Sequence, residues 1–298
     1  MEGHSSCTRD RGTAEADALS AEPAAVAPAP AGRRDLGSWR HFLYVTRALT
    51  ATEFKLRYFG SVLGYLWTLL RPLMLFGVLY VVFTHVVRFG DAVPHYPVVL
   101  LAAIVVFNFF SEATSAGLGS LVARENLLRK VSFPRAAVPI SVSMTAATNL
   151  ALGIVVVFMF AIVDGVDPSL GWIGFLACAL AAVVLATAAA VLLSVLFVRY
   201  RDVQPIWEVV LQLLFWGTPI IYTIESVPGD FQEIIMMNPL AVIIQQGRHW
   251  LAPSSTEGAS QAIGDPALLL VPLLIFAAVV VLSVWSFRSA EGRLAEDL

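Results

Sequence analysis

Several long runs of apolar residues with almost no charges constrain the fold of this chain more than any other feature. The clearest two cover about residues 138–163 and 170–198, and each is longer than the roughly 20 residues that a helix needs to cross a bilayer. A membrane β-barrel would instead have alternating segments of about ten residues, and the sequence contains none. Because 58% of the residues are hydrophobic and only 14% are charged, a soluble fold is excluded. The sequence predicts an all-α, polytopic membrane protein.

We predict six transmembrane helices and place both termini on the cytoplasmic side. Cytoplasmic segments of membrane proteins carry an excess of Arg and Lys. In this arrangement fourteen such residues between Arg33 and Arg293 lie inside, whereas the outer segments hold Arg88 and Arg248. The predicted localisation is therefore the cytoplasmic membrane, with multiple passes. The six crossings cover about residues 62–87, 96–122, 138–163 and 170–198, a part of 199–222, and 267–287.

Composition divides the chain into one membrane domain with a tail at each end. Residues 1–36 are rich in Ala, Pro and mixed charges, which favours a disordered cytoplasmic tail. Residues 37–290 form the predicted transmembrane domain, and residues 291–298 a second cytoplasmic tail. Cys7 lies in the first tail and Cys178 in an apolar run, so neither a disulfide nor a thiolate metal site is expected.

Residues 37–58 have the pattern of an amphipathic helix at the membrane interface. The apolar residues Phe42, Leu43 and Leu49 fall in one broad helical stripe, and the basic residues lie away from it. These basic residues either contact anionic lipid headgroups or belong to a gate or docking surface, and the sequence leaves both open. The candidate gate and headgroup residues are Trp39, Arg40, Arg47, Lys55 and Arg57.

The stretch 199–222 predicts a helix that is interrupted within the membrane. Asp202 is a candidate helix cap and Pro205 suits the first turn. Pro219 then removes one backbone N–H while its surroundings are still apolar. A broken helix at this depth is tolerated where protein or a water-filled cavity covers the freed groups. The break indicates a pathway, with an ordinary proline kink as the alternative.

Arg71 and Glu112 are charged residues inside predicted crossings. Each lies about ten residues from the inner end of its crossing, so both are on the order of 15 Å from the cytoplasmic surface. A charge at mid-membrane costs about 2.5–3.5 kcal/mol on insertion scales, so we expect the two to pair or to share a water-filled cavity. A structural ion pair and a transport role both fit the sequence. The third and fourth crossings contain few polar side chains and are predicted to be scaffold.

Two connections carry further candidates. Residues 123–135 form a short basic loop that either fixes the topology only or docks as a coupling element on a cytoplasmic protein. Residues 225–266 contain two helix-like segments, at 231–237 and 240–250, that are too short to cross. We predict two short re-entrant or surface helices there, before the last crossing.

The sequence lacks the motifs of nucleotide hydrolysis and of metal catalysis. No Gly-x-x-x-x-Gly-Lys-Ser/Thr segment occurs, so any ATP must be hydrolysed by another protein. No His-x-x-x-His, paired-cysteine or nucleophile-elbow motif occurs either. We therefore expect a chain that is not an enzyme and holds neither a catalytic residue nor a metal or cofactor of its own.

Aromatic side chains are the main chemical feature of the crossings. Rings near the membrane interfaces usually anchor a protein in the bilayer. Rings that face a pore would offer flat apolar surfaces suited to the C–H faces of sugar rings. The channel-lining candidates are Tyr65, Trp67, Phe107, Phe110, Phe215, Trp216 and Tyr222.

Five short segments follow the amphipathic helix in a fixed order. They are Phe59-Gly-Ser-Val-Leu-Gly-Tyr-Leu-Trp-Thr-Leu-Leu-Arg-Pro-Leu73, Glu125-Asn-Leu-Leu-Arg-Lys-Val-Ser-Phe-Pro-Arg135, Tyr200-Arg-Asp-Val203, Gly217-Thr-Pro-Ile-Ile-Tyr222 and Asn238-Pro-Leu240. In this order they resemble the transmembrane subunit of ABC type-2 polysaccharide exporters, the O-antigen, teichoic acid and cell-wall galactan permeases. The resemblance covers about residues 38–290.

The resemblance implies a homodimer of six-helix subunits around a continuous channel, with two ABC ATPase subunits below it. Residues 37–58 would be the gate helix, and ATP and Mg²⁺ would bind to the partner chain. The cargo would be a lipid-linked polysaccharide, and no nucleic acid would be involved. Residues 123–135 would be the coupling element, with Arg124, Glu125, Asn126, Arg129 and Lys130 as its candidate contacts.

Composition narrows the expected cargo further. Seventeen arginines against two lysines, with abundant Ala and Val, indicate a G+C-rich genome, and cell-wall galactan is then the best single candidate. There are two alternatives. A type-2 exporter of a drug or small lipid would have a tightly closed dimer seam, and an intramembrane enzyme acting on lipid-linked sugars would need acid, base or metal residues at one depth.

Overall fold

The computed structural model describes five stretches of the chain, and the predicted tails at 1–36 and 291–298 lie outside them. The described residues are 39–58, 64–86, 93–125, 134–263 and 266–290. They fold into helices, and no β-strand occurs within these ranges, so the predicted all-α class is confirmed. The elements are α2 (Trp39–Tyr58), α3 (Gly64–Val81), η1 (Val82–Val86), α4 (Tyr96–Leu118), α5 (Ser120–Ala123), α7 (Ala137–Val163), α8 (Gly171–Arg199), α9 (Val203–Gly217), η3 (Ile224–Ser226), α10 (Gly229–Met236), α11 (Pro239–Leu251), α12 (Ala259–Ala262), η4 (Pro266–Leu269) and α13 (Leu270–Ala290).

Four helical stretches are long and apolar enough to cross a membrane. They are α4, α7, α8 and the stretch Ala267–Ser289 that contains α13, and they coincide with the second, third, fourth and sixth predicted crossings. The first predicted crossing corresponds to α3 together with η1. The fifth corresponds to α9, which has only 15 residues. The count of six crossings therefore stays a prediction.

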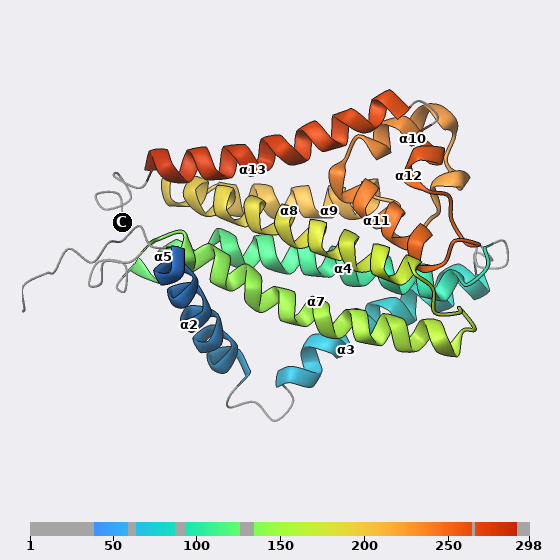
Figure 1. Cartoon of the computed structure of the whole chain (residues 1–298), viewed down its shortest axis with the longest axis horizontal. Helices are drawn as coiled ribbons and strands as arrows, with labels where there is room; N and C mark the ends of the chain where they lie inside the picture. Colours follow the sequence, from blue (N-terminus) through green and yellow to red (C-terminus); the bar gives the residue numbers. More distant parts are fainter. Residues whose placement is uncertain (1–38, 59–63, 87–92, 126–133, 264–265, 291–298) are drawn as a thin grey trace, which may run out of the picture. The chain divides into compact units, whose positions relative to one another are not determined.

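α4 lies at the centre of the packing. Its neighbours α7 and α8 run beside it (Figure 1), and α8 also contacts α11 and α13. The close approach of α4 and α8 depends on Gly117, since a Cβ at that position would lie 2.5 Å from the Cβ of Ala190. Ala190, a small residue of the fourth predicted crossing, therefore packs against α4 inside the chain.

α2 lies against α7, and this contact decides which of its sides is buried. Leu49 packs against the apolar cluster that contains Val138, and the hydroxyl of Thr50 donates to the Ser141 carbonyl at 3.5 Å. Leu43, which the predicted apolar stripe included, is 41% exposed. A side chain that faces lipid is also exposed in the isolated chain, so the predicted stripe stays a prediction at that residue.

Several helices end or change pitch at special backbone positions. α3 contains Pro72 and passes into the π-helix η1, and α4 ends before Gly119. α9 ends at Gly217, two residues before Pro219, so the predicted break is the end of a helix and not a kink. Asp202 occupies the N-cap position of α9 without a side-chain capping bond, so the predicted cap is wrong.

Candidate functional site

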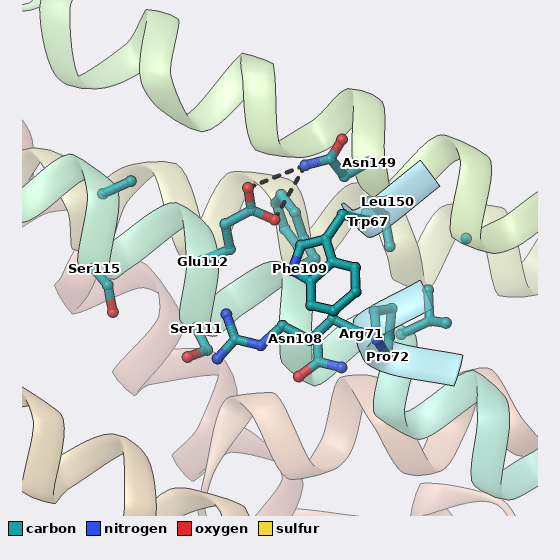
Figure 2. Close-up of a pocket in the computed structure, with 13 residues that line it drawn as sticks. Trp67, Arg71, Pro72, Asn108, Phe109, Ser111, Glu112, Ser115, Asn149 and Leu150 are labelled. Carbon is teal, nitrogen blue, oxygen red and sulfur yellow. Dashed lines mark hydrogen bonds between the residues drawn. The ribbon is translucent and has the colours of Figure 1, made fainter. Parts of the chain in front are cut away.

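A polar pocket lies between α3, α4 and α7 (Figure 2). Its volume is about 470 Å³, which falls within the ~300–1,000 Å³ typical of small-molecule sites. Val105, Phe109 and Leu150 supply apolar walls. The polar lining residues are Arg71, Asn108, Ser111, Glu112, Ser115 and Asn149.

Four of these polar residues share one face of α4. Asn108, Ser111, Glu112 and Ser115 stand at positions i, i+3, i+4 and i+7, which align along one side of a helix. Polar side chains inside a membrane are costly unless partners or water satisfy them. The pocket provides a polar space for these four side chains, and α7 and α3 supply its other walls.

Glu112 is held by an amide from α7. The Nδ2 of Asn149 donates to the Glu112 Oε1 at 3.0 Å and to its Oε2 at 3.2 Å (Figure 2). A hydrogen bond to a charged group contributes about 1.5–3 kcal/mol, so this contact orients the carboxylate. The third crossing, predicted to be scaffold, therefore supplies a site residue.

Arg71 reaches the same pocket from α3. Its side chain is exposed and extends into the pocket from the position before Pro72 (Figure 2). The two charges that the sequence places at matched depth thus line one pocket. A direct ion pair and a shared water-filled cavity both stay predictions for these two residues.

Trp67 lies one helical turn before Arg71, so the two side chains share a face of α3. Its indole lines the pocket and is 57% exposed. An exposed ring beside polar groups offers a flat apolar surface next to hydrogen-bonding partners. The pocket therefore suits a ligand that has both apolar and hydroxyl-bearing faces.

The segment after α9 contains backbone carbonyls outside any long helix, and Arg248 of α11 binds three of them. Its Nη1 donates to the carbonyls of Pro219 and Tyr222, the second at 3.3 Å, and its Nη2 to that of Ile220 at 3.4 Å. A guanidinium suits this role because it carries five N–H donors in a rigid fork.

Two more side chains bind the same segment. The hydroxyl of Tyr96 donates to the Ile221 carbonyl at 2.7 Å, and the Nδ2 of Asn238 lies 3.3 Å from the Thr218 hydroxyl. The protein itself therefore covers groups that the interruption frees, which is one of the two coverings expected from the sequence.

Arg248 is completely buried, and it belongs to the segment 240–250 that the sequence predicts as a short re-entrant or surface helix. Its relative exposure is 0%, and burial lowers the pKa of its guanidinium to about 10, so it stays protonated at neutral pH. It follows Ile244 by four residues and precedes Leu251 by three, so helical spacing places it on the apolar face of α11. This signal was present in the sequence.

Comparison with known proteins identifies the chain's family. A family model described as ABC-2 type transporter matches residues 44–250, which is more than half of the chain. The chain belongs to the ABC-2 type transporter family. It is thus a transport membrane subunit and not an enzyme, which decides against the intramembrane enzyme considered from the sequence. With its long apolar helices, this ABC-2 permease is a multi-pass protein of the inner membrane.

Relatives of this ABC-2 permease carry names from polysaccharide transport. An O-antigen export system permease protein RfbA of Klebsiella pneumoniae is 31% identical over 201 residues, covering 67% of this chain and 77% of the relative. The RfbA of Myxococcus xanthus is 27% identical over 271 residues, covering 89% and 98%. The polysialic acid transport protein KpsM of Escherichia coli is 23% identical over 226 residues, covering 72% and 83%.

The predicted channel-lining aromatics of the permease do not form one group. Phe107 and Phe110 are buried inside the chain, and the Phe107 ring meets that of Phe215 edge to face at 5.2 Å. Apolar packing within the subunit encloses these two rings, and a channel-lining role stays a prediction for them. Trp216 is 61% exposed, and the Tyr222 hydroxyl donates to its carbonyl at 3.3 Å. The side chain of Tyr65 lies outside the described residues.

The basic residues of the permease's amphipathic helix are described in part. The side chains of Arg40, Arg47 and Lys55 are exposed on α2. Those of Trp39 and Arg57 lie outside the described residues. The exposed cations are available both to headgroups and to a partner, so their role stays a prediction.

The beginning of the predicted coupling loop contacts the amphipathic helix. Arg124, just after α5, forms an ion pair with Glu53 of α2, and burial lowers the pKa of the Arg124 guanidinium. The ion pair joins the amphipathic helix to the coupling loop, which the sequence predicts as two separate elements. Glu125 is described as well, whereas the other coupling candidates, Asn126, Arg129 and Lys130, lie outside the described residues.

Proposed function

We propose that this permease is the membrane subunit of an ATP-driven exporter that moves a lipid-linked polysaccharide across the cytoplasmic membrane. The observation that carries the proposal is the alignment with an O-antigen export permease over 89% of this chain. Cell-wall galactan is the best single candidate for the cargo, on the Arg-rich composition. The polar pocket with an exposed indole supports a carbohydrate cargo over a drug or a small lipid.

The proposed assembly is a homodimer of six-crossing subunits, with both termini in the cytoplasm. α3 with η1 and α9 supply the two crossings beyond the four long helices, and α10 and α11 are the short outer helices. Exposed apolar side chains along α9 support a position in the membrane or against a second subunit. They are Ile206, Val209, Leu213 and Trp216.

ATP and Mg²⁺ bind in this proposal to two partner ATPase subunits, since the sequence has no phosphate-binding loop. The loop at 123–135 docks on the ATPase. The ion pair between Glu53 and Arg124 supports a mechanical link from that loop to α2, so a movement at the ATPase would displace the amphipathic helix. Such a displacement would admit the lipid-linked cargo.

Co-purification with the ATPase encoded beside this chain tests the function. We expect a stable complex with two copies of each subunit, whose ATP hydrolysis rises when a lipid-linked glycan extract of the source organism is added. An extract treated with mild acid, which cleaves the glycan from its lipid, is the control and leaves the rate at its basal value. A complex that responds to simple lipids or drugs but not to the glycan extract would favour the other exporter class.

A further inference from the structure

The pocket between α3, α4 and α7 offers hydrogen-bond donors and acceptors from three helices. Arg71 only donates, the Glu112 carboxylate only accepts, and Asn108 and Ser111 can do both. The Glu112 carboxylate accepts from the Asn149 amide at 3.0 Å and 3.2 Å, so it lines the pocket as an oriented acceptor. A molecule with several neighbouring hydroxyls satisfies such a mixed lining better than one that only accepts.

The charges of the pocket argue against an anionic ligand. The lining contains one basic residue, Arg71, and one acidic residue, Glu112. A phosphate group would gain the attraction of the guanidinium but would suffer repulsion from the carboxylate in surroundings of low dielectric. A neutral ligand can bridge both groups without this repulsion.

Trp67 adds a surface for the less polar face of such a ligand. Its exposed indole stands beside Arg71 on the same face of α3. Sugar rings carry C–H groups on one face and hydroxyls around the edge, so they match a flat aromatic ring flanked by polar groups. The volume of about 470 Å³ accommodates a ligand of small-molecule size.

We propose that this pocket binds a neutral sugar unit of the glycan and not the phosphate of its lipid carrier. The proposal rests on the proposed function, and it names the part of the cargo that the pocket recognises. Because a polymer in transit must both occupy a site and leave it, the binding is weak. The pocket thus acts as a sugar-selective station beside the transport route.

Saturation-transfer NMR on the full-length permease in phosphatidylcholine nanodiscs tests the proposal. The probes are phosphate-free glycan, released by mild acid from the lipid-linked fraction of the source organism, and inorganic pyrophosphate. The pocket variants are Arg71→Gln, Glu112→Gln and Trp67→Ala. The matched controls, Arg288→Gln and Trp285→Ala, change the same residue types at exposed positions on α13.

We expect the glycan to bind the unmodified permease and each pocket variant to weaken it about tenfold, as the loss of one charge-assisted hydrogen bond or one stacking contact predicts. Both controls keep full binding, and excess pyrophosphate does not displace the glycan. Where Glu112→Gln disturbs folding, Trp67→Ala still decides the outcome because its side chain is exposed.

Three results would overturn the proposal: no glycan binding to the unmodified permease, equal loss in pocket and control variants, or displacement by pyrophosphate with tighter pyrophosphate binding to Glu112→Gln. The last result would identify an anion site. Stimulation of the partner ATPase by the lipid-linked extract is measured separately. If that stimulation occurs while the pocket variants bind glycan normally, the proposed function stands and only the sugar site is wrong.

Discussion

Arg248 connects the short helix α11 to the segment that follows α9. Its guanidinium binds carbonyls at Pro219, Ile220 and Tyr222 while its own surface is completely buried. A buried cation is tolerated only when hydrogen bonds replace its lost hydration. Carbonyl oxygens supply that replacement at Nη1 and Nη2, while the buried Nε has no partner among the described residues. The cation and the irregular segment therefore depend on each other.

Replacing Arg248 tests this dependence. We expect Arg248→Met to destabilise the permease by about 3 kcal/mol or more, because several carbonyls lose a charged donor at once. Arg248→Lys keeps the charge but offers a single ammonium in place of the fork, so its effect should be intermediate. Thermal unfolding in detergent measures both variants.

Arg288→Met is the control for the loss of an arginine, because this residue is exposed on α13. It should leave the unfolding temperature within about 1–2 °C of the unmodified protein, as surface substitutions usually do. A stable Arg248→Met variant would mean that the carbonyls find water or other partners.

At the scale of elements, the contact of α4 with α8 depends on the absence of a side chain at Gly117. A Cβ there would lie 2.5 Å from the Cβ of Ala190 and 3.2 Å from its Cα. Real side chains do not approach so closely, so one helix would have to move. Since α4 also carries the polar stripe of the pocket, such a movement would reshape the site.

Gly117→Ala should therefore destabilise the permease by about 1–3 kcal/mol, the usual cost of overpacking. Gly119→Ala is the matched control, because nothing lies within 4 Å of a Cβ at that position and its φ is −83°. Unfolding of both variants in detergent distinguishes packing from a general effect of removing glycine. Equal stability of the two variants would contradict the close contact.

The ion pair between Glu53 and Arg124 is a second contact between elements, since it joins α2 to the end of α5. We expect Arg124→Glu to bring two carboxylates together and to loosen this part of α2. Faster amide hydrogen exchange across residues 46–56 would report the loosening. The double exchange Glu53→Arg with Arg124→Glu should restore slow exchange in part.

Lys55→Glu serves as the control for that experiment, because it reverses a charge at an exposed position of the same helix. It should leave the exchange of α2 nearly unchanged. If it accelerates exchange as much as Arg124→Glu does, net charge and not the specific pair governs the position of α2.

At the scale of the whole molecule, the topology depends on whether α9 crosses the membrane. With only 15 residues, a helix is about 22 Å long, which is short for a bilayer core of about 30 Å. The segment from Thr218 to Tyr222 would complete the passage without regular helix, because Arg248 binds its backbone carbonyls. The proposal of six crossings requires this.

Labelling of single cysteines measures the topology directly. In a background without Cys7 and Cys178, we expect Ser254→Cys and Asp167→Cys to react with an impermeant maleimide on intact cells. Gln204→Cys, at the start of α9, should react only after the membrane is opened. Reaction of Gln204→Cys and Ser254→Cys from the same side would exclude α9 as a crossing.

The amino-acid sequence by itself determined the features that depend on neighbours along the chain. The apolar runs predicted six crossings, and four of them are helices long and apolar enough to span a bilayer. Pro219 predicted an interruption at the end of α9, because proline lacks the backbone N–H that the preceding helical turn needs for its hydrogen bond. The Asn238-Pro239 pair likewise begins α11, where the Asn238 side chain accepts from the Leu240 N–H at 3.0 Å.

Only the tertiary structure decided which of these elements share a site. Glu112 and Asn149 are separated by 37 positions, and Arg248 lies 29 positions from the Pro219 carbonyl that it binds. The burial of Phe107 inside the subunit also follows from contacts between helices. Periodicity states which residues share a face of one helix, but which helix meets that face depends on how all of them pack.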